Sequence, residues 1–216
     1  MTDPHHPLMA IDIALEPDAV MMRRAFAENA ALRENFPQGF ALDATHHEHI
    51  TLLQGLVYTA DLPIIYAVAE ERLAKEKYTD WKLTAFKYYC VPAGPIGLAG
   101  IVIEPTAGLV RLQQQIIDAV APHTVTAGAA AAFYTTPGEP DIHPSLIPYV
   151  SDFVPTQTGK NYSPTSAPAS APRRFSMRCW QSRSKPSRSR RQVLRSISSA
   201  TTARRARNSR RFRPIK

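Results

Sequence analysis

Residues 49–58 of the chain read HITLLQGLVY. It is a mostly apolar run of strand length, rich in residues that favour β-structure, and it predicts a β-strand. Side chains alternate between the two faces of a strand, so His49, Thr51 and Leu53 are expected on one face and Ile50 and Leu52 on the other. The stretch therefore predicts an imidazole and a hydroxyl that point the same way.

The chain before this stretch predicts a strand and a helix. Leu8–Leu15 has strand character, and Asp18 then opens a helix that ends at Phe36-Pro37-Gln38-Gly39. Apolar residues at helical spacing predict its buried face: Met22, Ala25, Phe26 and Leu32. Asn29 interrupts this face, and the helix is expected to cover a sheet.

The chain after this stretch predicts a helix, a hairpin and another helix. Asp61 and Pro63 begin a helix that runs to about Lys77. Trp81–Val91 and Ile96–Glu104 then predict two strands joined by a turn at residues 92–95. Thr106 caps the next helix, which Pro122 ends, and its apolar residues are Leu109, Leu112, Ile116, Ile117 and Val120.

The last ordered part has a weaker pattern. Ala127–Tyr134 is ambiguous between helix and strand, and Pro144–Phe153 predicts a short helix. A further strand is expected to begin near Tyr162. Together the elements predict an α+β protein with one domain over residues 1–164.

The composition changes abruptly after Pro164. All 18 acidic residues lie between Asp3 and Asp152, so residues 1–163 carry a net charge of −8, whereas residues 164–216 carry +16 and no acid. Arg, Ser, Ala and Pro dominate this second part, which has too few apolar residues to fold alone. We expect residues 165–216 to form a disordered basic tail.

His49 and Thr51 are the candidate catalytic residues. A neutral imidazole accepts a proton near pH 7 and an imidazolium donates one, while a threonine hydroxyl bonds a phosphate oxygen. Two other interpretations stay open: the histidine bonds only a backbone carbonyl, or His47 and His49 bind a metal from a shared strand face. No further metal ligand with suitable spacing accompanies the two histidines.

With the segments HHEHITLLQ (46–54) and GKNYSP (159–164) in this order of elements, the chain resembles the two-histidine (2H) phosphoesterase superfamily, in its 2′-5′ RNA ligase-like branch. The resemblance covers roughly residues 8–164. It implies two pseudo-symmetric lobes of antiparallel sheet with helices on their outer faces. It also implies a cyclic phosphodiesterase that acts on 2′,3′-cyclic phosphates or 2′-5′ linkages of RNA or nucleotides without a metal or other cofactor.

The second His-x-Thr/Ser motif of that family is missing, because Thr165-Ser166-Ala167 follows Pro164. His123-Thr124-Val125-Thr126 places its second threonine on the wrong strand face. His143-Pro144-Ser145 contains a proline that cannot donate to a central sheet, so a loop or helix start is expected there. The second lobe is therefore expected to be incomplete, and the enzyme impaired.

The codons of residues 164–167 suggest why the second His-x-Thr/Ser motif is missing. Proline is CCN, threonine ACN, serine often TCN and alanine GCN. If the Pro164 codon ends in C, a frame one base earlier spells histidine, an apolar residue, and serine or glycine. In the same frame residues 175–181 spell an amphipathic helix such as FLDAMLA. We interpret residues 165–216 as the frameshifted translation of a GC-rich gene.

The cysteine content and the length of the apolar stretches limit the possible location of the protein. Two cysteines, Cys90 and Cys179, form no disulfide framework, and no stretch approaches about 18 apolar residues, so a cytoplasmic monomer without membrane contact is expected. Two alternatives to an enzyme remain: a nucleic-acid-binding protein that uses the +16 tail, and a small-ligand module without catalysis.

Overall fold

The computed structural model describes residues 7–39, 41–43, 46–93, 96–135, 140–172, 187–188 and 197–199. Within these residues the strands form two antiparallel sheets of four strands, in the orders β5-β2-β1-β8 and β6-β4-β3-β7. The helices pack against these sheets, so the expected α+β class is confirmed.

The strands and helices have the following residue ranges in chain order. The strands are β1 (Leu8–Leu15), β2 (Ile50–Tyr58), β3 (Thr84–Ala93), β4 (Ile96–Ile103), β5 (Thr124–Val125), β6 (Thr165–Pro172), β7 (Ser187–Arg188) and β8 (Ile197–Ser199). The helices are α1 (Ala19–Asn35), α2 (Leu62–Glu76), α3 (Ala107–Val120), α4 (Leu146–Ser151) and α5 (Phe153–Gln157).

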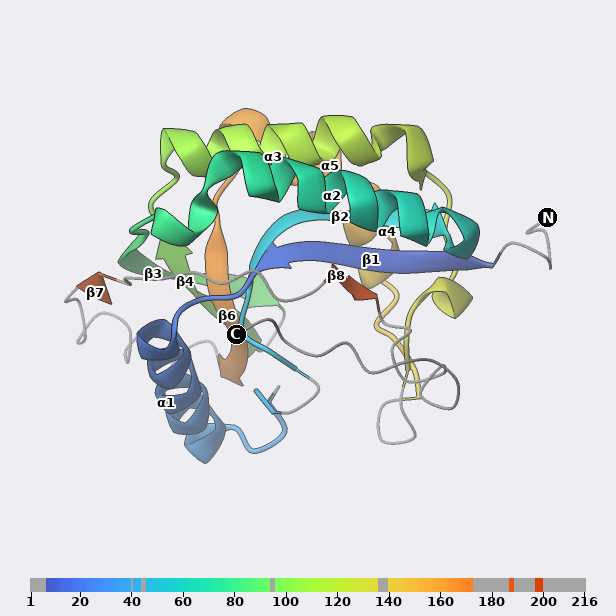
Figure 1. Ribbon diagram of the computed structural model, residues 1–216. Helices are drawn as coiled ribbons and strands as arrows, with labels where there is room; N and C mark the ends of the chain where they lie inside the picture. The colour runs from blue at the N-terminus through green and yellow to red at the C-terminus, as the bar shows by residue number, and fades with distance from the viewer. Residues whose placement is uncertain are drawn as a thin grey trace, which may run out of the picture.

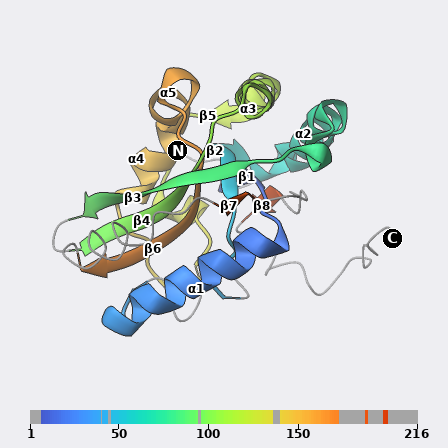
Figure 2. The ribbon, with the colours of Figure 1, turned by 90° about the vertical axis from the view of Figure 1, so that its left-hand side faces the viewer.

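The two sheets have separate helical covers (Figure 1). Helices α2 and α3 lie side by side, and α3 packs on β2 of the first sheet. Helix α1 lies against β6 of the second sheet, on the side away from α4 and α5 (Figure 2). We call the side of the first sheet that carries α2 and α3 its outer face, and the opposite side its inner face.

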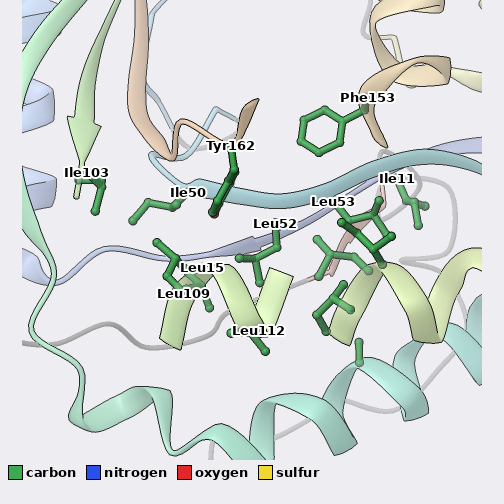
Figure 3. Close-up of a cluster of buried hydrophobic side chains, with 14 of the residues drawn as sticks. Ile11, Leu15, Ile50, Leu52, Leu53, Ile103, Leu109, Leu112, Phe153 and Tyr162 are labelled. Carbon is green, nitrogen blue, oxygen red and sulfur yellow. The ribbon is translucent and has the colours of Figure 1, made fainter. Parts of the chain in front are cut away.

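The inner and outer faces of β2 differ from the sequence expectation at one residue. Thr51 pairs with Ala14 whereas Leu53 pairs with Ile13, because the register shifts between Ile13 and Ala14. This β-bulge turns both Leu52 and Leu53 toward the outer face. Figure 3 shows the two leucines on the side of Leu109 and Leu112, which belong to α3. The expectation that Leu53 shares a face with Thr51 is therefore wrong.

The buried face of α1 also differs from expectation. Asp18 caps the helix as expected, because its Oδ1 accepts hydrogen bonds from the N–H groups of residues 20 and 21. The buried residues are Met21, Ala25, Asn29 and Leu32, whereas Phe26 is 40% exposed. Asn29 belongs to this face because its side-chain oxygen accepts the buried N–H of Leu42 at 3.1 Å.

The middle of the chain follows the sequence expectations, except that β3 spans Thr84–Ala93 where a strand over Trp81–Val91 was predicted. Helix α2 ends at Glu76, and Lys77 follows in the left-handed conformation. The hairpin of β3 and β4 forms, and Thr106 caps α3 by accepting the N–H of Leu109 at 3.2 Å. All five apolar residues predicted for α3 are buried in the main core. Local caps and helical periodicity were sufficient to place these elements.

The last part of the chain is arranged differently from the prediction. The single helix expected over Pro144–Phe153 is two short helices, α4 and α5, and the strand expected near Tyr162 begins at Thr165. Strand β6 pairs with β4 and lies at one edge of the second sheet. The described parts of the basic tail are strands, because β6 pairs with β4, β7 with β3 and β8 with β1, so the expected disorder is wrong for residues 165–172, 187–188 and 197–199. The rest of the tail, including residues 175–181, lies outside the described residues, and its disorder stays a prediction.

None of the helices in the described parts of the chain has both the length and the apolar character needed to cross a membrane.

Candidate functional site

The inner face of the first sheet carries a polar cluster near one end of β1 and β2. Asp12 and Gln54 are cross-strand partners, and Thr51 lies on the same face of β2. The Oδ2 atom of Asp12 accepts hydrogen bonds from Gln54 Nε2 at 2.7 Å and from Thr51 Oγ1 at 3.2 Å. We call Asp12, His49, Thr51 and Gln54 the polar cluster.

His49 completes the polar cluster from the residue just before β2. Its Nδ1 atom lies 2.7 Å from the carbonyl oxygen of His47, and its Nε2 atom lies 3.4 Å from Asp12 Oδ2. The His49 side chain is 38% exposed and that of Asp12 is 20% exposed. The imidazole is therefore accessible from outside while the carboxylate lies beneath it.

The surroundings of His49 favour its protonated form. Burial alone lowers the pKa of His49, but its hydrogen bond to Asp12, the charges of Asp12 and Glu48, and the bond to the His47 carbonyl outweigh burial. Together they raise the pKa from 6.5 to about 9. The imidazole is consequently a cation at neutral pH.

Tyr162 joins the polar cluster to the segment that leads into β6. Its hydroxyl donates a hydrogen bond to the backbone carbonyl of Thr51 at 3.2 Å, and its ring belongs to the main core. Burial raises the pKa of the Tyr162 hydroxyl, so it remains protonated and keeps its role as donor. Figure 3 shows Tyr162 and Phe153 across β2 from Leu52 and Leu53, which places them on the inner face.

The second sheet approaches the first through β6, whose first residue is Thr165. Strand β6 packs against β2 as well as pairing with β4. A side chain at Gly100 would collide with the Tyr89 ring and the Thr165 methyl group, so these two side chains lie together over the backbone of Gly100. Thr165, which follows the GKNYSP segment where the family resemblance predicts a second histidine, thus lies beside an aromatic ring.

Tyr149 of α4 lies close enough to Asp12 of the first sheet and Tyr89 of the second for their charges to act on it. Burial raises the pKa of its hydroxyl, and the charges of Tyr89 and Asp12 raise it further, so Tyr149 lies within electrostatic reach of both sheets. Its ring packs edge-on against Phe153, with centroids 6.2 Å apart and an interplanar angle of 83°. Tyr149 is nevertheless 45% exposed, so an aromatic surface borders the polar cluster.

The structure brings together the two residues predicted as catalytic and places His123 and His143 in other segments. His49 and Thr51 both contact Asp12 Oδ2. His123 precedes the two-residue strand β5, and His143 lies in a loop before α4, where its Nδ1 contacts Ser145 Oγ at 2.7 Å. Among the described residues, no group of three His, Cys, Asp or Glu side chains is placed to hold a metal ion.

Sequence reasoning missed Asp12, Gln54 and Tyr162. Asp12 is an acid in the middle of the apolar strand LMAIDIAL, and that position was a signal of a buried polar role. Gln54 shares a face with Thr51 only because of the bulge in the β1–β2 pairing, which no local pattern indicates. The contact of Tyr162 spans more than a hundred residues of chain.

No protein-family model matches the chain, and a search of curated proteins found no relative.

Proposed function

We propose that this protein derives from a two-histidine phosphoesterase that acts on 2′,3′-cyclic phosphates or 2′-5′ phosphodiester linkages of RNA or nucleotides. One observation carries the proposal: the imidazole of His49 and the hydroxyl of Thr51 meet on the inner face of β2, where β6 of the other sheet approaches. A phosphate between the two sheets would lie within reach of side chains from both strands.

The proposed reaction needs one acid and one base. The oxygen of a water molecule attacks phosphorus, the base removes its proton, and the acid protonates the ribose oxygen that leaves. Each group typically contributes about 10²–10⁴-fold to the rate. Thr165 supplies neither a base nor an acid near neutral pH, so this chain is expected to be impaired. The expected cytoplasmic location and monomeric state are parts of the same proposal.

The test measures hydrolysis of 2′,3′-cyclic AMP by the full chain and by a chain whose reading frame is restored after codon 164. Resequencing codons 160–170 shows which of the two the gene encodes. We expect the restored chain to be at least about a hundredfold faster. Replacing its recovered histidine by alanine should remove that gain, and this variant controls for the effect of the restored strands on folding.

A matched pair of variants tests the surviving histidine. His49→Ala should abolish turnover in the restored chain, whereas His143→Ala should not change it, because His143 lies in an exposed loop. Equal rates for the present chain, the restored chain and His49→Ala would contradict the proposal. Binding of 2′,3′-cyclic AMP without turnover in every one of these chains would instead identify a ligand-binding module.

A further inference from the structure

The hydrogen-bond geometry of His49 fixes where its protons lie. Its Nδ1 atom faces the His47 carbonyl at 2.7 Å, and a carbonyl oxygen only accepts, so Nδ1 carries a hydrogen. Its Nε2 atom faces Asp12 Oδ2 at 3.4 Å, and a carboxylate also only accepts. A neutral Nε2 would direct its lone pair at this negative oxygen. Both ring nitrogens therefore face acceptors, which is the arrangement of an imidazolium.

Asp12 in turn needs a cation beside it. Its hydrogen-bond donors, Thr51 and Gln54, are neutral and both bond Oδ2. Its Oδ1 atom is buried and makes no hydrogen bond to any described residue. A largely buried carboxylate is costly unless it is paired, and His49 is the nearest group that supplies positive charge. The ion pair therefore keeps the His49 imidazole protonated and neutralises the charge of the buried Asp12 carboxylate.

From this arrangement, we propose that Asp12 is a positioning residue that holds His49 as an imidazolium, so that His49 is the general acid of the reaction. The inference rests on the proposed function. In the step it assigns, the water oxygen bonds to phosphorus, one of the two bonds from phosphorus to a ribose oxygen breaks, and the proton of Nε2 passes to that ribose oxygen. In the frame-restored chain the recovered histidine is then the general base that takes the proton of the water.

The charged and titratable groups around His49 all favour this state. Asp12 faces it from β1, and Glu48 of its own segment adds a second negative charge. Tyr149 of α4 approaches Asp12, and its raised pKa keeps its hydroxyl neutral. Tyr162 approaches Thr51 and is likewise neutral. Among the described residues, no cation is recorded as acting on the pKa of His49.

The test follows the His49 ring nitrogens by NMR in the full chain, without substrate. In the wild type both nitrogens should be protonated at pH 7.5, and His49 should titrate near pH 9. In Asp12→Asn the pKa should fall toward the ordinary 6.5, with loss of the Nε2 proton at pH 7.5. Asp12→Glu, which keeps the charge, should restore most of the shift.

Asp43→Asn is the matched control, because Asp43 pairs with His46 at 3.0 Å on the same segment but lies outside the polar cluster. It should leave the His49 titration unchanged. A wild-type His49 that titrates near 6.5 would overturn the inference, and that measurement requires no variant. So would an Asp12→Asn protein that is folded, by its amide spectrum, but titrates like the wild type.

The turnover of the frame-restored chain separates this inference from the proposed function. Asp12→Asn should move the high-pH limb of its rate profile to lower pH and lower kcat more than it changes KM. If His49 titrates as expected but no chain hydrolyses 2′,3′-cyclic AMP, the proposed function fails while the ion pair stands. If hydrolysis occurs and Asp12→Asn leaves the high-pH limb of the rate profile unchanged, the role of His49 as general acid is contradicted while the proposed function stands.

Discussion

Two sheet faces offer different chemistry: the inner face of the first sheet, and the face of the second sheet that carries Tyr89 and Thr165, which we call the inner face of the second sheet. The first sheet presents the ion pair of His49 and Asp12, with Thr51 and Gln54 bonded to the same carboxylate oxygen. The second presents Thr165 and the Tyr89 ring over Gly100. One sheet therefore holds a preorganised proton donor, whereas the other has a surface for contact without an acid or base.

This difference shows that strand pairing and acid–base chemistry depend on different features of the sequence. Strand β6 pairs with β4 although its sequence, TSAPASAP, is poor in apolar residues. Backbone hydrogen bonds formed from any non-proline residue are enough for such pairing, whereas acid–base catalysis depends on one particular side chain. Substitutions in both sheets test this contrast.

The largest expected effect comes from giving the second sheet an imidazole. Under the proposed function, Thr165→His in the present chain should raise the rate of 2′,3′-cyclic AMP hydrolysis by up to about a hundredfold, because the new imidazole would act as the general base. Steady-state kinetics measure the gain. Ser163→His, which adds an exposed histidine two residues earlier, should produce none. Equal gains from both variants would show that a general surface imidazole, and not the position, is responsible.

The next effect concerns the outer face of the first sheet. Leu53→Ala should lower the free energy of unfolding by about 2–5 kcal/mol, because the bulge buries this side chain in the core. Urea denaturation measures the loss. Leu146→Ala, at a position that is 42% exposed, should change stability by about 0.5 kcal/mol or less. If Leu53→Ala were as mild as Leu146→Ala, Leu53 would not lie on the buried face.

A smaller effect tests how tightly the inner face of the second sheet is packed. Gly100→Ala should cost about 1–3 kcal/mol, because its methyl group would collide with Tyr89 and Thr165. Gly55→Ala is the matched control in β2, since the added carbon would lie 3.5 Å from Thr124 Cγ2, an ordinary contact. Thermal unfolding of the two variants should therefore differ, with Gly55→Ala close to the wild type.

The smallest effect is the pH dependence of stability. The folded-state pKa of His49, about 9, lies above its ordinary value of 6.5. Its stabilising contribution is thus complete below pH 6.5 and is lost as the pH rises to 9. Because the side chain is 38% exposed, the loss should be about 1 kcal/mol or less. Denaturation across this pH range should show a shallower fall in Asp12→Asn than in the wild type.

The sequence alone predicted the features that depend on neighbouring residues. The bounds of β1, the caps of α1 and α3, the end of α2 and the hairpin of β3 and β4 all follow from side chains within a few positions. The sequence also predicted that His49 and Thr51 lie on one face of a strand, because the alternation of side chains over three residues depends only on the local backbone.

Only the tertiary structure decided which distant groups complete the site. A bulge depends on the partner strand, so the face of Leu53 and the place of Gln54 were hidden from a single-strand pattern. Asn29 is buried because it bonds the backbone of Leu42, thirteen residues away. Asp12 contacts His49 from the neighbouring strand β1. The protonation of the imidazole depends on the hydrogen-bond partners of both ring nitrogens, which only the three-dimensional structure brings into place.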